Sequence, residues 1–278
     1  MTESPPVEFE AGGRITLTTD FGIADGYVGA MKGRILTVAP DVRIEDLAHD
    51  LEPQNLRQAS AALCAALPFW PAGTVHLAVV DPGVGSERAA VVVLAGGHIL
   101  VGPDNGLLEP AARRLGFAGS WRIMLTAATR RFLPEEAAPT FHGRDIFAPI
   151  AAAIAAGALA PEDAGDPIDL APLALPPVLQ TGGRTEGRVL YCDHFGNAIT
   201  NLRASDFGGG DDARAIHVHF GTGRHASFVR TYSDAERGQP LALIGSDGYL
   251  EIAVRDGSAR ADLGIATGDP VRVEHSAP

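Results

Sequence analysis

The chain has 278 residues, of which 46% are hydrophobic, and both values suit a globular protein with a sizeable core. Its formal net charge of -12 argues against a nucleic-acid partner, which needs clustered Lys and Arg, and against an anionic membrane surface. The two cysteines, Cys64 and Cys192, form no disulfide framework or zinc-ligand spacing, and no apolar run has the roughly 18 residues of a membrane span. We therefore expect a soluble cytoplasmic protein.

The first half of the sequence alternates predicted strands with predicted helices. A strand at 14–19 precedes a helix at 27–38, whose buried stripe we expect to be Tyr27, Met31, Ile35 and Leu36. Continuous apolar strands that end in Gly-rich turns predict an α/β domain with a mostly parallel sheet, which places ligands beyond the carboxyl ends of its strands. Further strands are expected at 42–47, 74–80, 89–94 and 98–101, and further helices at 55–67, 109–115 and 146–156.

Composition changes after this half. Residues 159–183 are rich in Pro, Ala and Gly, and helical spacing disappears beyond them. We assign 1–165 to the N-terminal α/β domain, 166–183 to a linker and 184–278 to an all-β domain. Short strands with regular turns favour a small barrel or a sandwich there. The expected strands are 185–191, 215–220, 227–231, 241–244, 249–254 and 270–273.

Three residues of the first half are candidates for chemistry at strand ends. Asp20 follows the first strand, where a carboxylate can accept hydrogen bonds from a ribose diol or simply cap the next helix. Asp81 opens the turn DPGVGS, which can fold Arg88 back toward it. The alternative is an exposed salt bridge of little energetic value. A partly buried carboxylate would need such a partner, and this favours a functional pair.

His142 stands in the run TFHGRD and could serve as a base, a relay or a hydrogen-bond donor. For a lone histidine, simple packing with Asp145 as a helix cap is the favoured interpretation.

The all-β half has two polar turns. In DHFGN, Asp193 offers an ammonium acceptor, Phe195 an aromatic face, and Asn197 an amide that can pair with an adenine edge. An ordinary β-turn is the alternative, because Asp, Gly and Asn are turn formers. Ser246, in GSDGY, has the same ambiguity.

Missing motifs narrow the classes of enzyme. The sequence contains no phosphate-binding P-loop, no HExxH zinc motif and no GxSxG nucleophile turn. Four aspartates leave a metal-dependent phosphohydrolase open, and a non-catalytic binder of adenosine-type ligands also remains open. Those aspartates are Asp20, Asp25, Asp81 and Asp104.

As an ordered set, several motifs resemble one family, the S-adenosylmethionine hydroxide adenosyltransferases, which are related to fluorinase and chlorinase. The set runs from Thr18 to Val254, nearly the whole chain, and is specific although each piece alone is weak. Its members are TTDFGIADGYVGAMKG, VVDPGVGSER, VGPDNGLL, FHGRDIFAP, DHFGNAITN and GSDGYLEIAV.

The resemblance implies hydrolysis of S-adenosylmethionine to adenosine and methionine without a metal or cofactor. It implies a homotrimer whose active sites lie between one subunit's N-terminal domain and its neighbour's C-terminal domain. Asp81, Arg88 and His142 match the residues that position and activate water. The matching substrate-binding residues are Asp20 at the ribose, Asp193 and Ser246 at the methionine end, and Phe195 and Asn197 around the adenine.

Three positions depart from the halogenase pattern. Asp81 replaces a tyrosine, Gly143 replaces the halide-binding serine, and Gln54 replaces a tryptophan. A carboxylate at Asp81 would repel halide and suits water or hydroxide, so the resemblance favours hydrolysis over halogenation. The DHFGN turn is also one residue shorter than the halogenase turn.

Overall fold

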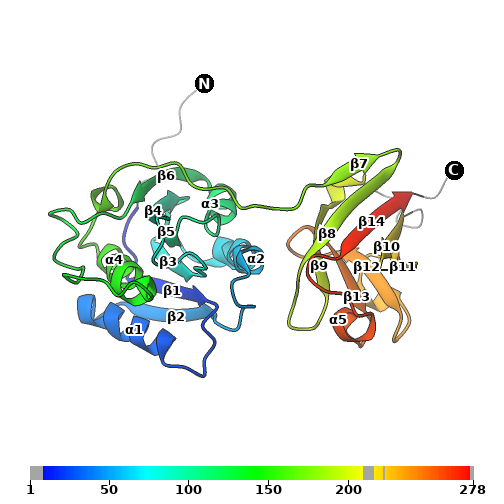
Figure 1. Ribbon diagram of the computed structural model, residues 1–278, viewed down its shortest axis with the longest axis horizontal. Coiled ribbons are helices and arrows are strands. Elements are labelled where there is room, and N and C mark those ends of the chain that lie inside the picture. Colours follow the sequence, from blue (N-terminus) through cyan, green and yellow to red (C-terminus); the bar gives the residue numbers. More distant parts are fainter. Residues whose placement is uncertain (1–8, 209–215, 222, 276–278) are drawn as a thin grey trace. The chain divides into compact units, whose positions relative to one another are not determined.

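The computed structural model describes residues 9–208, 216–221 and 223–275. The chain divides into two compact units, Met1–Ala174 and Leu175–Pro278 (Figure 1). Each unit has its own hydrophobic core.

A six-stranded sheet forms the centre of the first unit. Its first four strands in spatial order are parallel. At one edge β4 pairs antiparallel with β5, and β6 pairs antiparallel with β4. This confirms the predicted α/β architecture with a mostly parallel sheet. The spatial order is β2 (Arg43–Ala48), β1 (Arg14–Thr19), β3 (Thr74–Val79), β5 (His98–Pro103), β4 (Ala90–Ala95) and β6 (Phe117–Arg122).

Helices cover both faces of this sheet. The helices α1 (Tyr27–Val38) and α4 (Ala148–Ala155) share one apolar cluster with it, and α2 (Leu56–Ala66) and α3 (Glu109–Leu115) share another. Alternate strand residues supply the two clusters, because successive side chains of a strand point to opposite faces. Val92 belongs to the first cluster, for example, and its neighbours in β4 belong to the second.

The expected buried stripe of α1 was only partly right. Met31 and Ile35 are buried, but Tyr27 is 52% exposed and Leu36 is 43% exposed. Val28 takes the inward position instead. Tyr27 begins the helix, and its ring packs on neighbouring loops rather than on the sheet.

The second unit is a closed barrel of seven strands. Each strand is hydrogen-bonded to the next, and the pairing of β14 with β8 closes the barrel. The barrel is therefore confirmed, and the sandwich alternative is wrong. The order is β14 (Pro270–His275), β10 (Ile216–Phe220), β11 (Arg224–Phe228), β12 (Pro240–Ile244), β13 (Tyr249–Val254), β9 (Ala198–Arg203) and β8 (Arg184–Cys192).

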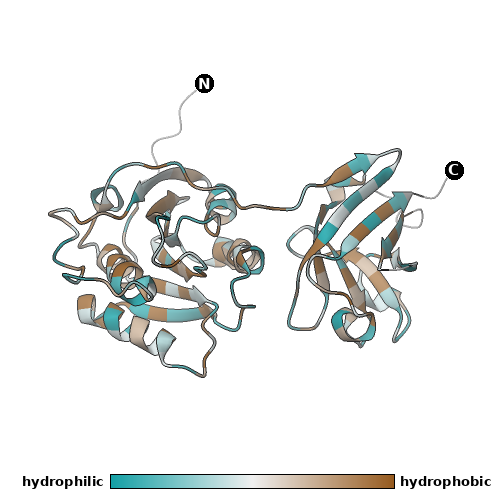
Figure 2. Cartoon of the chain, in the orientation of Figure 1, coloured by the Kyte–Doolittle hydropathy of each residue, from teal (hydrophilic) through white to brown (hydrophobic). Residues whose placement is uncertain are grey.

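The first part of β8 alternates between exposed and buried residues, whereas β9 and β13 are buried along most of their length. Figure 2 shows the hydropathy of the residues along these strands. The short strand β7 (Leu179–Thr181) pairs with β8, and α5 (Ala259–Asp262) follows β13. The strand expected at 227–231 lies earlier, at Arg224–Phe228, and the expected strand start at 215 lies outside the described residues.

The predicted linker, 166–183, is in contact with folded elements at both ends. Pro167 pairs with Trp121, and the Ala171 N–H donates to Asp104 over 2.8 Å, so this part of the chain remains with the first unit. Strand β7 belongs to the second unit. The functional boundaries at 165 and 184 stay a prediction.

Candidate active site

Asp81 and Arg88 form a nearly buried ion pair beyond the carboxyl end of β3. Arg88 Nε donates to both carboxylate oxygens of Asp81 at 3.0 Å, and its terminal NH2 group also donates to Oδ2. The exposed fractions of the side chains are 10% for Arg88 and 5% for Asp81. The turn between them does fold Arg88 back, and the exposed salt bridge considered from sequence is wrong.

The turn that carries this pair requires a glycine at Gly85. Its φ is +78°, and a Cβ there would lie 2.7 Å from the carbonyl oxygen of Pro139. A side chain would therefore push the Asp81 turn away from the segment that leads to His142.

His142 completes this cluster. The NH2 group of Arg88 lies 2.9 Å from Nδ1 of His142. Because a guanidinium only donates, Nδ1 accepts, and in a neutral ring the hydrogen is then on Nε2. Burial and, next, the charge of Arg88 lower the pKa of His142, while Asp81 and Asp145 act in the opposite direction. At neutral pH the ring is therefore an uncharged donor through Nε2.

A π-helical turn at Gly143–Phe147 follows His142 and leads into α4. Such turns are frequent at functional sites. The Arg88 guanidinium lies 5.2 Å from the centre of the Phe147 ring, which is fully buried. Asp145 does not cap α4 as expected: it is inside the π turn, where it accepts from the Ala138 N–H at 2.9 Å and pairs with Arg144.

Asp20 lies at the same edge of the sheet as Asp81, because β1 and β3 are parallel neighbours paired up to Thr19 and Val79. Its Oδ2 accepts the Gln54 backbone N–H at 2.8 Å. Gln54 has a φ of 65°, a left-handed conformation that is uncommon for a residue other than glycine. The carboxylate does not cap α1, whose first turn has no side-chain cap.

An aromatic cluster joins the Asp20 loop to the His142 loop. Phe141 packs edge-on against Tyr27 at 5.5 Å and against Phe21 at 6.0 Å between ring centres. Phe21 follows Asp20 and Phe141 precedes His142 in sequence, so Asp20 and His142 lie beside one aromatic cluster. Sequence reasoning missed this contact, because no local spacing connects residues so far apart.

In the second unit, Asp193 and Asn197 close the turn between β8 and β9. The Asp193 carboxylate accepts the backbone N–H of Asn197 at 2.8 Å and its side-chain amide at 3.0 Å. Asn197 is 7% exposed, whereas Phe195 at the tip is 75% exposed. The structure thus bears out the β-turn interpretation and also presents an aromatic ring beside a buried amide.

Phe195 and Asn197 line one cavity of about 610 Å³. Tyr232 and Arg255 line it as well, and neither was identified from sequence because they stand in no recognisable motif. The Tyr232 hydroxyl donates to Glu251, whose pKa is raised by burial and by the nearby charges of Asp193 and Asp247. Aromatic rings and polar groups around one hollow suit a flat heteroaromatic ligand.

Ser246 lies outside this wall, exposed in the turn between β12 and β13. The described residues contain no group of three or more His, Cys, Asp or Glu side chains that could hold a metal ion. Of the four aspartates considered for a metal, Asp81 pairs with Arg88 and Asp104 accepts a backbone N–H.

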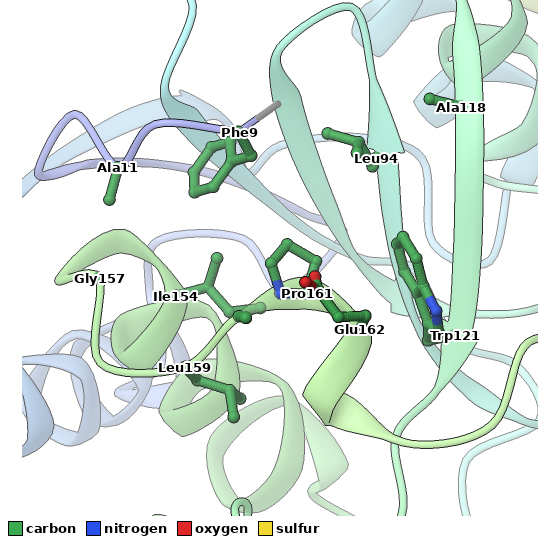
Figure 3. A pocket seen from close by; sticks show the side chains of 11 residues that line it. Phe9, Ala11, Leu94, Ala118, Trp121, Ile154, Gly157, Leu159, Pro161 and Glu162 are labelled. Carbon is green, nitrogen blue, oxygen red and sulfur yellow. The ribbon is translucent and has the colours of Figure 1, made fainter. Parts of the chain in front are cut away.

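A larger hollow of about 760 Å³ in the first unit contains none of the predicted site residues. Figure 3 shows Phe9, Leu94 and Trp121 around it, with Glu162 as its charged side chain. Its lining is chiefly apolar and offers no constellation for catalysis. Within the part of the chain that the structure describes, no helix has the length and apolar character needed to cross a membrane.

Each of the two units matches a domain of one known protein family. Residues 15–165 match the SAM hydroxide adenosyltransferase N-terminal domain, and residues 187–272 match the C-terminal domain of that family. The (R)-S-adenosyl-L-methionine hydrolase of Thermus thermophilus is 46% identical, over 92% of this chain and 97% of its own length. The hydrolase of the same name from Salinispora tropica is 41% identical over 93% and 97%.

More distant relatives and solved structures agree. The fluorinase of Actinopolyspora mzabensis is 25% identical over 94% of this chain and 97% of its own length. A crystal structure described as an uncharacterized conserved protein from Thermotoga maritima superposes with a TM-score of 0.83 at 34% identity, covering 94% of this chain and all of that one. The chain therefore belongs to the SAM hydroxide adenosyltransferase family.

Proposed function

We propose that this protein hydrolyses S-adenosyl-L-methionine to adenosine and L-methionine. The observation that carries the proposal is the Asp81–Arg88–His142 cluster at the edge of the sheet. The relatives with (R)-S-adenosyl-L-methionine hydrolase in their names, which are 36–46% identical, support it. Their names specify the (R) form of the sulfonium, so this epimer is the first substrate to test.

Water attacks the ribose 5′-carbon in line with the departing sulfur. The C–O bond forms as the C–S bond breaks, methionine leaves as a neutral thioether, and one proton of the water passes to solvent. Because bulk water has a pKa of about 15.7, the site must favour hydroxide-like character. Arg88 contributes positive charge and His142 contributes its Nε2–H as a donor, while Asp81 holds Arg88 in place.

The substrate-binding residues of the proposal come from both units. Asp20 holds the ribose hydroxyls, and Phe195 and Asn197 hold the adenine in the barrel cavity, whose aromatic and polar lining supports this role. Asp193 and Ser246 bind the methionine end, although the Asp193 carboxylate also holds the turn together. Holding both ends of the substrate aligns the reacting atoms, which contributes several kcal/mol to catalysis in well-oriented reactions.

Assembly and location belong to the same proposal. The protein is a cytoplasmic homotrimer, and each active site combines the first unit of one subunit with the barrel of another. The functional domains are residues 1–165 and 184–278, and residues 166–183 link them. A mixing experiment tests this. His142→Ala and Asn197→Ala proteins, each inactive alone, would regain part of the activity when unfolded and refolded together. No regain in a verified mixed trimer would contradict a shared site.

The reaction itself is tested by incubating the pure protein with each sulfonium epimer in ¹⁸O-labelled water, with and without EDTA. Adenosine and methionine should appear in equal amounts, with the label in the adenosine 5′-hydroxyl, whether or not EDTA is present. Binding without turnover would make the protein an adenosine-type binder. Loss of turnover with EDTA, together with hydrolysis of a phosphate ester, would favour the metal-dependent phosphohydrolase.

A further inference from the structure

His49 follows β2 and is 7% exposed, next to β1, the strand that leads into Asp20. The pairing of β1 with β2 shifts by one residue: Leu17 pairs with Asp46, but Thr18 pairs with Ala48. The shift brings His49 beside Thr19, the last residue of β1. Thr19 Oγ1 and His49 Nδ1 lie 2.8 Å apart, and both side chains are buried.

The other ring nitrogen of His49 contacts a charged pair. Nε2 lies 3.0 Å from Asp46 Oδ1, and Lys32 Nζ donates to Asp46 Oδ2 at 2.6 Å. Burial raises the pKa of Asp46, but hydrogen bonds from His49 and Lys32 outweigh it, so the net pKa is lowered and the group is a carboxylate. A carboxylate only accepts, so Nε2 donates to it, and in the neutral ring Nδ1 is then left to accept from the Thr19 hydroxyl.

The direction of the Thr19–His49 hydrogen bond determines which further contact the Thr19 hydroxyl oxygen can make. With its hydrogen used toward His49, its lone pairs face the backbone N–H of Phe21 at 3.3 Å. The His49 carbonyl also accepts the Gly22 N–H at 2.9 Å. The residues on both sides of Asp20 are thereby attached to His49 or to Thr19.

The Asp20 carboxylate is attached independently. Its Oδ2 accepts the Gln54 N–H at 2.8 Å. This uses one of about four lone-pair positions of a carboxylate, so the others can accept the two ribose hydroxyls. A rotation of the Asp20 backbone would move those positions away from the sugar, and misplacements of about 1 Å can cost 100-fold in rate.

We propose that His49 is a positioning residue which, through Thr19 and the Phe21–Gly22 backbone, holds the Asp20 carboxylate in the orientation that accepts the ribose diol. The inference rests on the proposed role of Asp20. Lys32 and Asp46 keep the His49 ring in the tautomer that this role needs.

The same strand provides a matched control. Thr16 Oγ1 lies 2.7 Å from Nδ1 of His76, another buried threonine–histidine contact. Thr16 is three residues before Thr19 and therefore on the opposite face of β1. Thr16→Val removes a hydroxyl of the same kind from the same strand without touching the Asp20 turn.

The experiment measures the binding of adenosine and of 2′,3′-dideoxyadenosine by calorimetry. The ratio of the two dissociation constants measures how strongly the site prefers a ligand that has the ribose diol. We expect the wild-type protein to prefer adenosine. Thr19→Val and Asp20→Asn should each reduce that preference about tenfold, because hydrogen bonds to charged groups are of this strength. Thr16→Val should keep the wild-type ratio, and Thr19→Ser should restore it.

Two His49 variants separate the ring nitrogens. Asn reaches the position of Nδ1 and Gln that of Nε2, so His49→Asn should retain more of the preference than His49→Gln. If Thr19→Val keeps the preference while Asp20→Asn loses it, the inference is overturned and the proposed function stands. Equal losses in Thr16→Val and Thr19→Val would reduce the effect to general packing. A wild type without any preference would remove the proposed role of Asp20 itself.

Discussion

Arg88 donates a hydrogen bond to Nδ1 of His142 over 2.9 Å, and this contact determines which ring nitrogen of His142 remains available. The same guanidinium donates to both oxygens of Asp81. The Arg88 guanidinium therefore orients the Asp81 carboxylate on one side and the His142 imidazole on the other. The fork of five donors is essential here, because a single point charge cannot keep two such contacts in a fixed geometry.

Replacing Arg88 with lysine tests that dependence. Lysine keeps the positive charge near Asp81, so we expect a small change in the free energy of unfolding, but it cannot reach both partners. We expect kcat to fall about 100-fold, the lower end for the loss of a positioned proton-transfer or donor group. Arg113→Lys is the control, because the Arg113 side chain is exposed on α3, where it pairs with Glu109. Equal kcat values for wild type and Arg88→Lys would remove the guanidinium from the mechanism.

The pH profile should report the lowered pKa of His142. Burial and the Arg88 charge keep the ring neutral below its ordinary value of 6.5. If the neutral ring is the active form, kcat/KM stays constant as the pH falls through 6.5 and declines only at lower pH. Arg88→Gln removes a cause of the lowered pKa, so the residual activity should decline at higher pH than in wild type. A wild-type midpoint above 6.5 would contradict this protonation state.

His76 should control how acid destabilises the first unit. Burial, and next the neighbouring His98, lower its pKa to about 3, and burial also lowers the pKa of His98. The unfolded chain binds protons at these rings near pH 6.5, whereas the folded chain does so only at lower pH. The free energy of unfolding therefore falls with pH below 6.5, by up to about 1.4 kcal/mol per pH unit for each ring.

Removing one of these rings should flatten that decline. We expect His76→Gln to lose stability less steeply than wild type between pH 6.5 and 4.5, whatever its stability at pH 7. Urea unfolding followed by tryptophan fluorescence measures this, because Trp70 and Trp121 both lie in the first unit. His194→Gln, exposed on the barrel, should keep the wild-type slope. Identical slopes for all three proteins would show that His76 takes up its proton in the folded state as readily as in the unfolded one.

Elements whose sequence pattern matched their burial were predictable. The strand at 14–19 and the helices at 27–38 and 109–115 have the expected bounds. The strand Phe117–Arg122 was missed because Ala118 and Gly119 are poor strand formers and its burial does not alternate. The strand Ala198–Arg203 was missed as well: it includes a buried asparagine, Asn201, whose amide is satisfied only by the fold, through Pro176 and Arg188.

In the candidate site, too, contacts within one short segment could be predicted from the sequence, and contacts between distant segments could not. The Asp81–Arg88 contact follows from one short turn, so the sequence alone could suggest it. His142 is 54 residues from Arg88, and only the family resemblance connected them. The packing of Phe141 against Tyr27 and the wall formed by Tyr232 and Arg255 depend on tertiary structure, and no local spacing indicates them.

Phe195 offers the sharpest test of the barrel cavity, because it is 75% exposed and contributes little to folding. Stacking of a base on an aromatic ring contributes about 1–3 kcal/mol, so Phe195→Ala should weaken adenosine binding about tenfold or more. Its free energy of unfolding should stay within about 0.5 kcal/mol of wild type, as for other exposed substitutions. Phe69→Ala, 87% exposed in the first unit, is the matched control and should bind adenosine normally. Equal loss of affinity in both variants, or in neither, would place the adenine outside the cavity that Phe195 shares with Asn197.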